Sequence, residues 1–600
     1  MAGARRFFLD VERSAQGRAW RDRLDDRTRA LALAMTQEHG LSDLMARVIA
    51  GRGITTDTVD AFLQPTIKAA MPDPSVLTDM AAAVERLSLA VTKREPVAIF
   101  GDYDVDGATS SALLALFLRH AGLDPVIHIP DRLTEGYGPN ADAIRRLREA
   151  GASLLVTLDC GTTSHEVLAQ AVAMGLDVVV IDHHQADEVL PTVTALVNPN
   201  RLDDVSGLGS LCAAGVTFMV IVALNRRLRE DGFWNARRPA PDLMSLLDLV
   251  ALGTVADVVP LTGLNRAFVA RGLDVMRRRE NVGLRALMDA ARLDGPPTPY
   301  HLGFLLGPRV NAGGRIGDAA LGARLMTTED PVEAGRIAAE LDRLNRERQV
   351  VEQGTVAQAE AEALAALGPD EEGASVIVTA GRGWHAGVVG LVAARLKERF
   401  KRPAFAIAFE GDVGTGSGRS IAGVDLGSAV RRAVAQGILV KGGGHAMAAG
   451  VTLTRERLAA FRAYLEEALG TAIEVARREE ALLIDGATTA GALSRDFVAS
   501  LDRAGPFGSG NPEPVLALPS HTLIYADRVG EAHVKARLKS GDGATVDAIA
   551  FRCVGKPLGD LLLGSRGRPL HVAGTVSLDR WQGNERVQLR IQDAAEPARV

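Results

Sequence analysis

The stretch PVAIFGDYDVDG (residues 96–107) decides the fold class. A short apolar run ends there in three closely spaced aspartates, and a run with helical spacing, TSSALLALFLRHAG (109–122), comes next. Three more short apolar runs follow, with a second helical pattern between the first two of them: SLLVTLD (153–159), DVVVID (177–182) and TALVNP (194–199). Strands that alternate with helices predict a parallel α/β sheet in this part of the chain.

Acidic and imidazole side chains stand at the ends of three of these predicted strands. In chain order they are Asp102, Asp104, Asp106, Asp159, Asp182, His183 and His184. Because the carboxyl ends of parallel strands meet at one edge of a sheet, we expect these side chains to converge on one crevice. Asp257, which closes the apolar helical run LLDLVALGTVADVVP (246–260), is a further candidate.

So many carboxylates in one place would repel one another unless a cation neutralised them. Oxygen donors with one or two imidazoles suit manganese or magnesium better than zinc. Two ions about 3.5–4 Å apart could activate a water and stabilise both oxygens of a phosphoester displacement. A single aspartate after a strand is often only a turn former or helix cap, but acidic ends on three successive strands are hard to obtain from turn chemistry.

The rest of the chain divides by pattern. Helical spacing predicts helices up to about residue 90 and again from about 210 to 295. Residues 329–366 are either a solvated surface helix or, as their length and position favour, a connector between two α/β lobes. About five short strands after residue 480 fit a small barrel such as an OB-fold. The predicted parts are an N-terminal helical region (1–90), a first α/β domain (91–328), a connecting helix (329–366), a second α/β domain (367–475) and a β-barrel domain (476–600).

Two glycine-rich segments of the second α/β domain carry polar side chains. GTGSGRS (414–420) contains Ser417 and Arg419, and KGGGHAMAAG (441–450) contains His445. Glycines let backbone N–H groups approach phosphate oxygens, and an arginine can fork onto them. Composition alone favours two ordinary turns between strands, so both interpretations stay open.

Composition limits the classes of function. The formal net charge of −6 excludes a uniformly basic nucleic-acid coat, so any nucleic-acid site must be a local basic patch. The three cysteines form no C-x-x-C pair, which supports neither a disulfide framework nor a zinc ribbon. The sequence has no signal-peptide pattern and no run of about 18 apolar residues, so we expect a cytoplasmic protein without a membrane span.

Asp182-His183-His184 resembles the motif that names the DHH phosphoesterases. GDYDVDG (101–107), Leu158-Asp159-Cys160-Gly161 and Ala256-Asp257 resemble the other metal motifs of that family. The resemblance is closest to the RecJ branch and covers nearly the whole chain in order. It also rests on RVNAGGRIG (309–317), LDRLNRERQ (341–349), WHAGVVGLVAARL (384–396), GSGRS (416–420), GGGHAMAAG (442–450) and PFGSGNPEP (506–514). One departure is the first glycine of GGGH, where the family has GGH after an aromatic residue.

The resemblance implies a DHH-type catalytic domain, a DHH-associated substrate-binding domain and a nucleic-acid-binding OB-fold. It implies two Mn²⁺ or Mg²⁺ ions, with ligands at Asp102, Asp104, Asp159, His183 and Asp257. His184 would contact or polarise the scissile phosphate, and Asp106 would shape the loop or support the ligands.

The resemblance also implies that the second α/β domain binds the DNA backbone and the 5′ end. The candidate substrate-binding residues are Arg132, Arg309, Arg315, Ser417, Arg419 and His445. Trp384 could stack a base, although a lone tryptophan is more often part of a core. In the tail, Lys535, Arg537 and Lys539 alternate along one predicted strand and either line a binding groove or form a solvated face.

The expected activity is metal-dependent hydrolysis of single-stranded DNA from the 5′ end to 5′-mononucleotides, in DNA repair and recombination. A helicase and a single-strand-binding protein are implied partners, and we expect a monomer. Two alternatives remain. A small-nucleotide phosphodiesterase is disfavoured by the N-terminal helices and the β-rich tail, and a non-catalytic DNA-replication scaffold of the same fold is disfavoured by the intact carboxylates.

Overall fold

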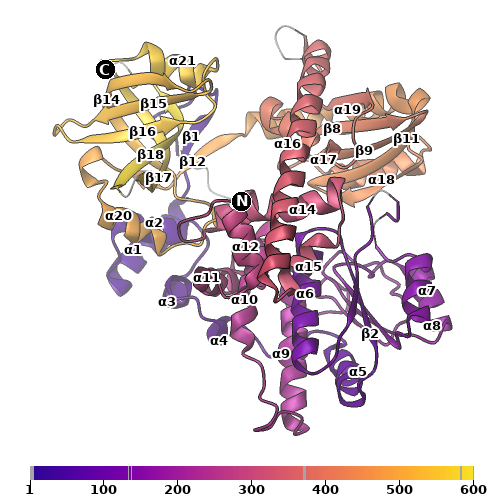
Figure 1. Ribbon diagram of the computed structural model, residues 1–600. Coiled ribbons are helices and arrows are strands. Elements are labelled where there is room, and N and C mark those ends of the chain that lie inside the picture. Colours follow the sequence, from indigo (N-terminus) through magenta and orange to yellow (C-terminus); the bar gives the residue numbers. More distant parts are fainter. Residues whose placement is uncertain (1–5, 133, 137, 369–372, 582–583, 599–600) are drawn as a thin grey trace.

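One long helix, α16 (Pro331–Leu367), runs through the middle of the molecule (Figure 1). The computed structural model describes residues 6–132, 134–136, 138–368, 373–581 and 584–598. The first α/β domain lies around one end of α16, the second α/β domain beside its other end, and the C-terminal barrel stands apart from both (Figure 1). The sequence predicted this connecting helix to within two residues at its start.

The first α/β domain contains a five-stranded parallel sheet in the order β3-β2-β4-β5-β6. Its strands are β2 (Val97–Gly101), β3 (Val126–His128), β4 (Leu154–Leu158), β5 (Asp177–Ile181) and β6 (Ala195–Val197). Every residue of β2 and β4 is buried, which explains their continuous apolar sequences. The sequence analysis missed β3, because it has only three residues and none of them is buried.

Helices cover both faces of this sheet. One face packs against α5 (Met80–Lys93), α6 (Val105–His120) and α9 (Ala213–Glu230), and the other against α7 (Ala141–Glu149) and α8 (His165–Ala173). The predicted helical stretch from about 210 to 295 also contains α10 (Leu247–Ala256), α11 (Gly263–Arg278) and α12 (Val282–Ala290). Helices continue beyond it with α13 (Pro299–His301), the π-helical turn η4 (Leu302–Leu306), α14 (Gly307–Ile316) and α15 (Leu321–Thr327). Among the described residues, no helix combines the length and the apolarity needed to cross a membrane.

The second α/β domain has a mixed sheet in the order β10-β11-β9-β8-β7. Its elements are β7 (Ile377–Arg382), α17 (Val389–Phe400), β8 (Ala404–Glu410), β9 (Val413–Arg419), α18 (Leu426–Ala435), β10 (Lys441–His445), β11 (Ala448–Thr454) and α19 (Leu458–Arg478). The two glycine-rich segments are therefore mostly strand, and the interpretation of both as turns is wrong.

Strand β9 also corrects the idea of a backbone phosphate cradle. It pairs with β8 on one side and β11 on the other, so its N–H groups serve the sheet. A Cβ at Gly418 would come within 2.4 Å of the Phe405 ring, and one at Gly416 within 2.7 Å of Ile407. These glycines are needed for packing, which leaves the side chains of Thr415, Ser417 and Arg419 as the polar features of this strand.

The C-terminal domain is a closed barrel in which β14 pairs with both β15 and β17. Its strands are β14 (Leu516–Val529), β15 (His533–Lys539), β16 (Thr545–Ala550), β17 (Pro569–Trp581) and β18 (Asn584–Ala595), with α21 (Pro557–Gly564) between β16 and β17. The five predicted strands are confirmed, but β14, β17 and β18 span 14, 13 and 12 residues and are not short.

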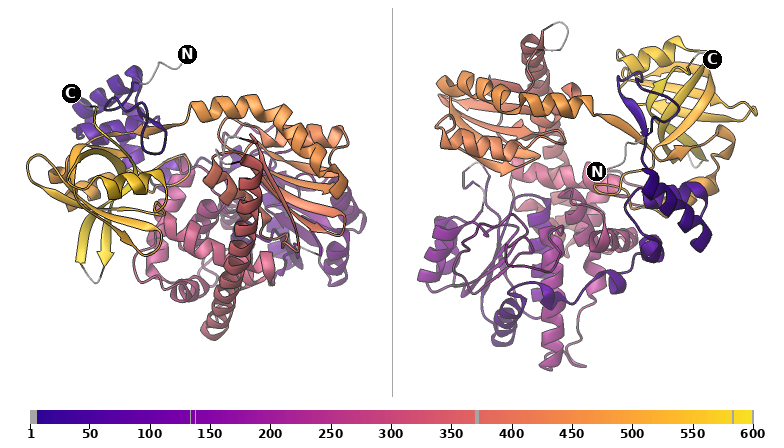
Figure 2. Two further views of the ribbon diagram at one scale, coloured as in Figure 1. Left: turned by 90° about the horizontal axis from the view of Figure 1, so that it is seen from above. Right: turned by 180° about the vertical axis from the view of Figure 1, so that it is seen from behind.

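The N-terminal region packs against this barrel rather than forming a separate helical unit (Figure 2). It begins with β1 (Ala19–Asp22), which pairs in parallel with β12 (Ala481–Ile484). Trp20 in β1 is fully buried, and its Nε1–H donates to Asp593 at 3.3 Å. Helices α1 (Asp26–His39), α2 (Asp43–Ala50) and α3 (Val59–Leu63) share a core with Leu516, while α4 (Ile67–Ala70) and α5 belong with the first α/β domain. The prediction of a purely helical region over 1–90 is therefore wrong.

Candidate active site

Asp102 and Asp104 lie at the carboxyl end of β2, in a tight turn into α6. Asp104 is the N-cap of this helix, and its carboxylate accepts a hydrogen bond from the Gly107 N–H at 3.0 Å. A Cβ at Gly107 would lie 2.4 Å from the Asp102 carbonyl oxygen, so only glycine lets the first helical turn pack this closely. The turn places both carboxylates at the edge of the sheet, as the sequence predicted.

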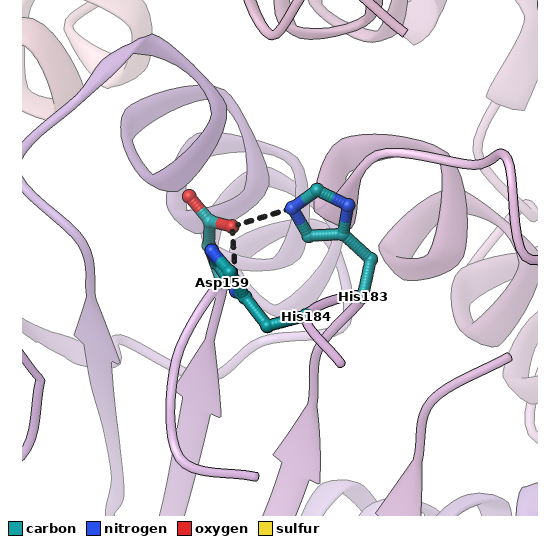
Figure 3. A group of neighbouring side chains, drawn as sticks. All are labelled: Asp159, His183 and His184. Carbon is teal, nitrogen blue, oxygen red and sulfur yellow. Dashed lines mark ion pairs between the residues drawn. The ribbon is translucent and has the colours of Figure 1, made fainter. Parts of the chain in front are cut away.

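Asp159 follows β4, the neighbour of β2, and its backbone has a φ of 62°. Aspartate tolerates this left-handed conformation better than most residues, and such conformations cluster at functional sites. Its carboxylate oxygen Oδ1 lies 3.2 Å from Nε2 of His183 and 3.9 Å from Nδ1 of His184 (Figure 3). The ends of β4 and β5 therefore meet, as expected for neighbouring parallel strands.

Asp182 holds the two histidines in place. Its carboxylate accepts hydrogen bonds from the backbone N–H groups of His183 at 2.8 Å and His184 at 3.2 Å, and from Nδ1 of His184 at 2.8 Å. Burial acts to raise the pKa of Asp182, but the hydrogen bond and the charge of His184, with a hydrogen bond from Thr162, hold it below the ordinary value. Burial opposes protonation of His184, yet Asp182 and nearby carboxylates raise the pKa of His184 to about 9. His184 thus carries a positive charge at neutral pH in the metal-free protein.

Two asparagines that the sequence analysis missed fix the backbone of the histidine pair. Asn198 is fully buried and donates from Nδ2 to the His184 carbonyl at 2.8 Å and to Thr162 Oγ1 at 2.9 Å. Asn200 donates to the His183 carbonyl. Both lie in VNPN directly after β6, so their place at a strand end was the available signal.

Asp106 and Asp257 approach His183 from the helical side. Asp257 follows the last residue of α10, and an oxygen of each carboxylate lies 3.8 Å from His183 Nε2. Asp106 accepts the N–H groups of Ala213 at 2.6 Å and Ala214 at 2.9 Å, the first amides of α9. A Cβ at Gly253 in α10 would come within 2.8 Å of Asp106. Asp106 thus joins α6, α9 and α10 behind the site.

The donor atoms fall into three groups in which all ligand atoms lie within 4.8 Å of one another. The groups are Asp102, Asp104 and Asp159; Asp159, His183 and His184; and Asp106, His183 and Asp257. Burial and neighbouring carboxylates raise the pKa of Asp102 and Asp159 well above the ordinary value and that of Asp257 to about 9.

A bound dication would relieve both features of this cluster. It would offset the repulsion between carboxylates, and it would satisfy Asp102 Oδ1, a buried oxygen that has no hydrogen-bond donor among the described residues. Carboxylate oxygens with imidazole nitrogen are a donor set that manganese and magnesium accept. The predicted ligand set therefore fits the metals that the sequence implied.

Three of the predicted substrate-binding arginines gather between the two lobes. Burial and the charges of Arg132 and other arginines, including Arg419, lower the pKa of Arg315 to about 10. Burial and Arg132 likewise lower the pKa of Arg419, whose guanidinium donates to Ser417 Oγ at 2.8 Å. The guanidinium carbon of Arg132 lies 5.1 Å from the ring centroid of Tyr103, the residue between Asp102 and Asp104 in the turn after β2. Mutually repelling arginines of this kind suit an anion such as a phosphate group.

His445 also joins the site from the second α/β domain. Burial and the nearby charges of Arg419 and His184 lower the pKa of His445. Its Nδ1 accepts the Met447 N–H at 3.4 Å, which leaves Nε2 as the proton-bearing nitrogen when the ring is neutral. The imidazole can therefore donate a hydrogen bond from this side of the site.

Arg309 does not join the arginine cluster. Its guanidinium forms an ion pair with Asp342 of α16 at 3.0 Å and donates to the Leu305 carbonyl at 2.7 Å, which fastens α14 to the long helix. Trp384 donates from Nε1 to Gln358 Oε1 at 2.8 Å, and its ring lies against Gly381. These contacts favour a packing role for Trp384 over base stacking.

Family models match three separate regions of the chain. The model described as "DHH family, N-terminal domain" matches residues 96–254, the "DHHA1 domain" matches 373–471 and the "RecJ OB domain" matches 484–593. The three matches follow the first α/β domain, the second α/β domain and the barrel in order.

Named relatives and solved structures also match over nearly the whole chain. Proteins named single-stranded-DNA-specific exonuclease RecJ from Dickeya dadantii and Escherichia coli are 37% and 35% identical, each over 92% of this chain and 96% of the relative. The crystal structure of RecJ with Mn²⁺ from Thermus thermophilus matches with a TM-score of 0.76 at 30% identity, over 95% of this chain and 78% of that one. The structure of the same protein with Mg²⁺ matches with a TM-score of 0.71 at 29% identity, over 95% and 77% of the two chains.

Proposed function

Because the chain belongs to the RecJ family of single-stranded-DNA-specific exonucleases, we propose that it removes 5′-mononucleotides one at a time from the 5′ end of single-stranded DNA. The observation that carries the polarity is the arginine cluster beside the carboxylates. Arg132 acts on the pKa of Asp102, and Arg315 is close enough to Asp104 to feel its charge. A phosphate held by these arginines lies next to the metal ligands.

The cluster of carboxylates and imidazoles fits Mn²⁺ or Mg²⁺, and the residues that would hold two such ions are Asp102, Asp104, Asp159, His183 and Asp257. When bound, the ions activate water and offset the negative charge that develops on the phosphoester. Asp106 would then act through its neighbours, because its carboxylate already accepts two amides of α9.

The chain's own groups supply binding and orientation. Asp182 fixes the ring and the charge of His184, so that the other ring nitrogen, Nε2, can donate to an oxygen of the scissile phosphate. A 5′-terminal phosphate differs from an internal one in its additional charge and free oxygens. Arg419, Arg315 and Arg132 can read that difference through charge-assisted hydrogen bonds.

The barrel contributes a second contact with the strand. The side chains of Lys535, Arg537 and Lys539 alternate with buried residues along β15 and are exposed on its outer face. Arg537 is paired with Asp547 at 2.7 Å, which leaves the two lysines as the stronger candidates. We propose that this face holds DNA downstream of the 5′ end, and that a helicase and a single-strand-binding protein supply the unpaired substrate in repair and recombination.

Activity on three substrates tests the substrate class. With Mn²⁺, the protein should degrade a long 5′-phosphorylated single strand faster than the matching blunt duplex and faster than a dinucleotide. A preference for the dinucleotide would instead support the small-nucleotide phosphodiesterase alternative. Absence of hydrolysis with both Mn²⁺ and Mg²⁺, together with retained strand binding, would support the non-catalytic scaffold.

A further inference from the structure

Tyr300 and Phe304 form an exposed aromatic stack that the arrangement of the metal site does not explain. Their ring centroids are 5.2 Å apart with an interplanar angle of 27°. Tyr300 is 64% and Phe304 72% exposed, which makes them the two most exposed aromatic side chains among the described residues. Aromatic residues make up only 4% of the chain, so two neighbouring rings in solvent are a notable departure.

The local backbone holds this pair rigidly. Thr298 and His301 form a reciprocal cap at the start of α13, with the Thr298 N–H donating to His301 Nδ1 at 3.1 Å. The His301 ring packs edge-on against Tyr300 with a centroid distance of 5.9 Å. Phe304 lies in η4, a π-helical turn, and such turns are frequent at functional sites. A preformed stack costs little entropy when a third flat ring is added.

The segment that carries the stack contacts one element of the site and leads directly into another. The turn η4 packs on the end of α10 that carries Asp257: a Cβ on Gly303 would lie 3.5 Å from Val255. The same turn runs directly into α14, where Gly314 packs against the Tyr103 carbonyl and Arg315 enters the arginine cluster. The rings of Tyr300 and Phe304 therefore lie on α13 and η4, between the two elements that deliver Asp257 and Arg315 to the site.

We propose that Tyr300 and Phe304 are a stacking platform for a nucleobase of the single-stranded substrate. The inference rests on the proposed function. The same segment ends with Arg315, one of the arginines that the proposed function assigns to phosphate, so a polyanionic strand is the partner that it favours. An outer ring face suits any base, so the platform serves a nuclease that must accept every sequence.

The experiment is an abasic scan of strand binding in a metal-free buffer. It uses 5′-phosphorylated single strands that each lack one base at successive positions. The wild-type protein should bind about tenfold more weakly when one particular base, or two adjacent ones, is missing, as expected for a lost stacking contact. Phe304→Leu should bind the intact strand with an affinity that is lower by a similar factor. Removal of the base at that position should not lower the affinity of this variant any further.

Two further variants complete the design. Phe304→Trp restores a ring and should restore both the affinity and the dependence on that base. Val332→Ala, at an 80% exposed site in the first turn of α16, is the control and should match the wild type throughout. Two results would contradict the platform. Either no missing base weakens binding by the wild-type protein, or the missing base weakens binding by Phe304→Leu by the same factor as it weakens binding by the wild type.

Failure of the platform and failure of the proposed function give different results. A wild-type protein that degrades single strands with Mn²⁺ but is indifferent to every missing base contradicts only the platform. A wild-type protein that neither binds nor degrades single strands contradicts both.

Discussion

Asp159 lies at the centre of the site because two of the three donor groups include its carboxylate. Asp159→Asn keeps the size of the side chain and tolerates the same left-handed backbone, but removes the charge. We expect the variant to lose at least about 99% of its cleavage rate, since a metal site supplies several kcal/mol of transition-state stabilisation. Titration of Mn²⁺ should show weaker binding, while the melting temperature of the metal-free variant should equal or exceed that of the wild type. Retained cleavage with normal Mn²⁺ affinity would remove Asp159 from the ligand set.

Asp248 provides a pH test that is separate from the metal site. It lies in the first turn of α10, is 3% exposed, and burial raises its pKa to about 7. Because the folded-state pKa lies above the unfolded one, this carboxyl stabilises the fold at low pH, and that contribution is lost as the pH rises from about 4 through 7. Asp248→Asn should therefore raise the melting temperature at pH 8 relative to the wild type and change it little at pH 4. An equal effect at both pH values would contradict the shifted pKa.

Arg419 should contribute mainly to recognition of the 5′ phosphate. We expect Arg419→Ala to raise KM for 5′-phosphorylated strands by about ten- to hundredfold, which corresponds to a charged hydrogen bond of about 1.5–3 kcal/mol. The KM for 5′-hydroxyl strands should change much less, and Mn²⁺ affinity should not change. Equal losses on both kinds of strand would mean that Arg419 binds the backbone without reading the end.

At the scale of elements, strand β15 carries the prediction for the barrel. Lys535→Gln combined with Lys539→Gln should weaken binding of long single strands and lower the slope of log affinity against log salt by about 1.4, because each lysine that contacts a phosphate releases a counterion. Cleavage of short oligonucleotides should change less. The control is Lys68→Gln with Lys93→Gln, two exposed lysines outside the barrel, on α4 and α5. An unchanged salt slope would make the β15 face a solvated surface.

These substitutions are a better test than deleting the barrel. The side chain of Arg266 in α11 is buried and donates to the carbonyls of Phe62 at 3.0 Å and Ala504 at 2.9 Å, so it joins three parts of the chain. Trp20 in β1 also donates from Nε1 to Asp593, a residue that the deletion would remove. Deletion from about residue 515 would therefore disturb the N-terminal region as well as DNA binding.

At the scale of the whole molecule, the strand-end residues were predictable because each stands next to a short apolar run. Asp102, Asp159 and His183 lie close together because they follow adjacent strands of a parallel sheet. The alternation of strands and helices in the sequence predicts such a sheet. The pairing of β1 with β12 was not predictable, because it joins segments more than 400 residues apart without a local signal. The glycine-rich strand β9 was missed because glycine is depleted in strands, and Phe405 and Ile407, which require it there, are brought close only by the fold.

Side-chain roles showed the same limit. The sequence placed Arg309 with the substrate-binding arginines, but Asp342, which pairs with it, lies 33 residues away on α16. The sequence analysis did not single out Asn198 and Asn200, whose amides reach the carbonyls of the histidine pair only in the folded chain. Local patterns thus identified the carboxylates and imidazoles that gather at the strand ends, whereas the residues that orient them depend on tertiary contacts.

The most direct test of the proposed polarity is a time course on one single strand labelled at either end, in the presence of Mn²⁺. With a 5′ label, the label should appear in mononucleotides from the earliest time points. With a 3′ label, the strand should shorten progressively and release its label last, and a circular strand of the same sequence should resist. Mononucleotides released first from the 3′ label, or circular strands cut as fast as linear ones, would contradict a nuclease that holds the 5′ phosphate beside its metal ligands.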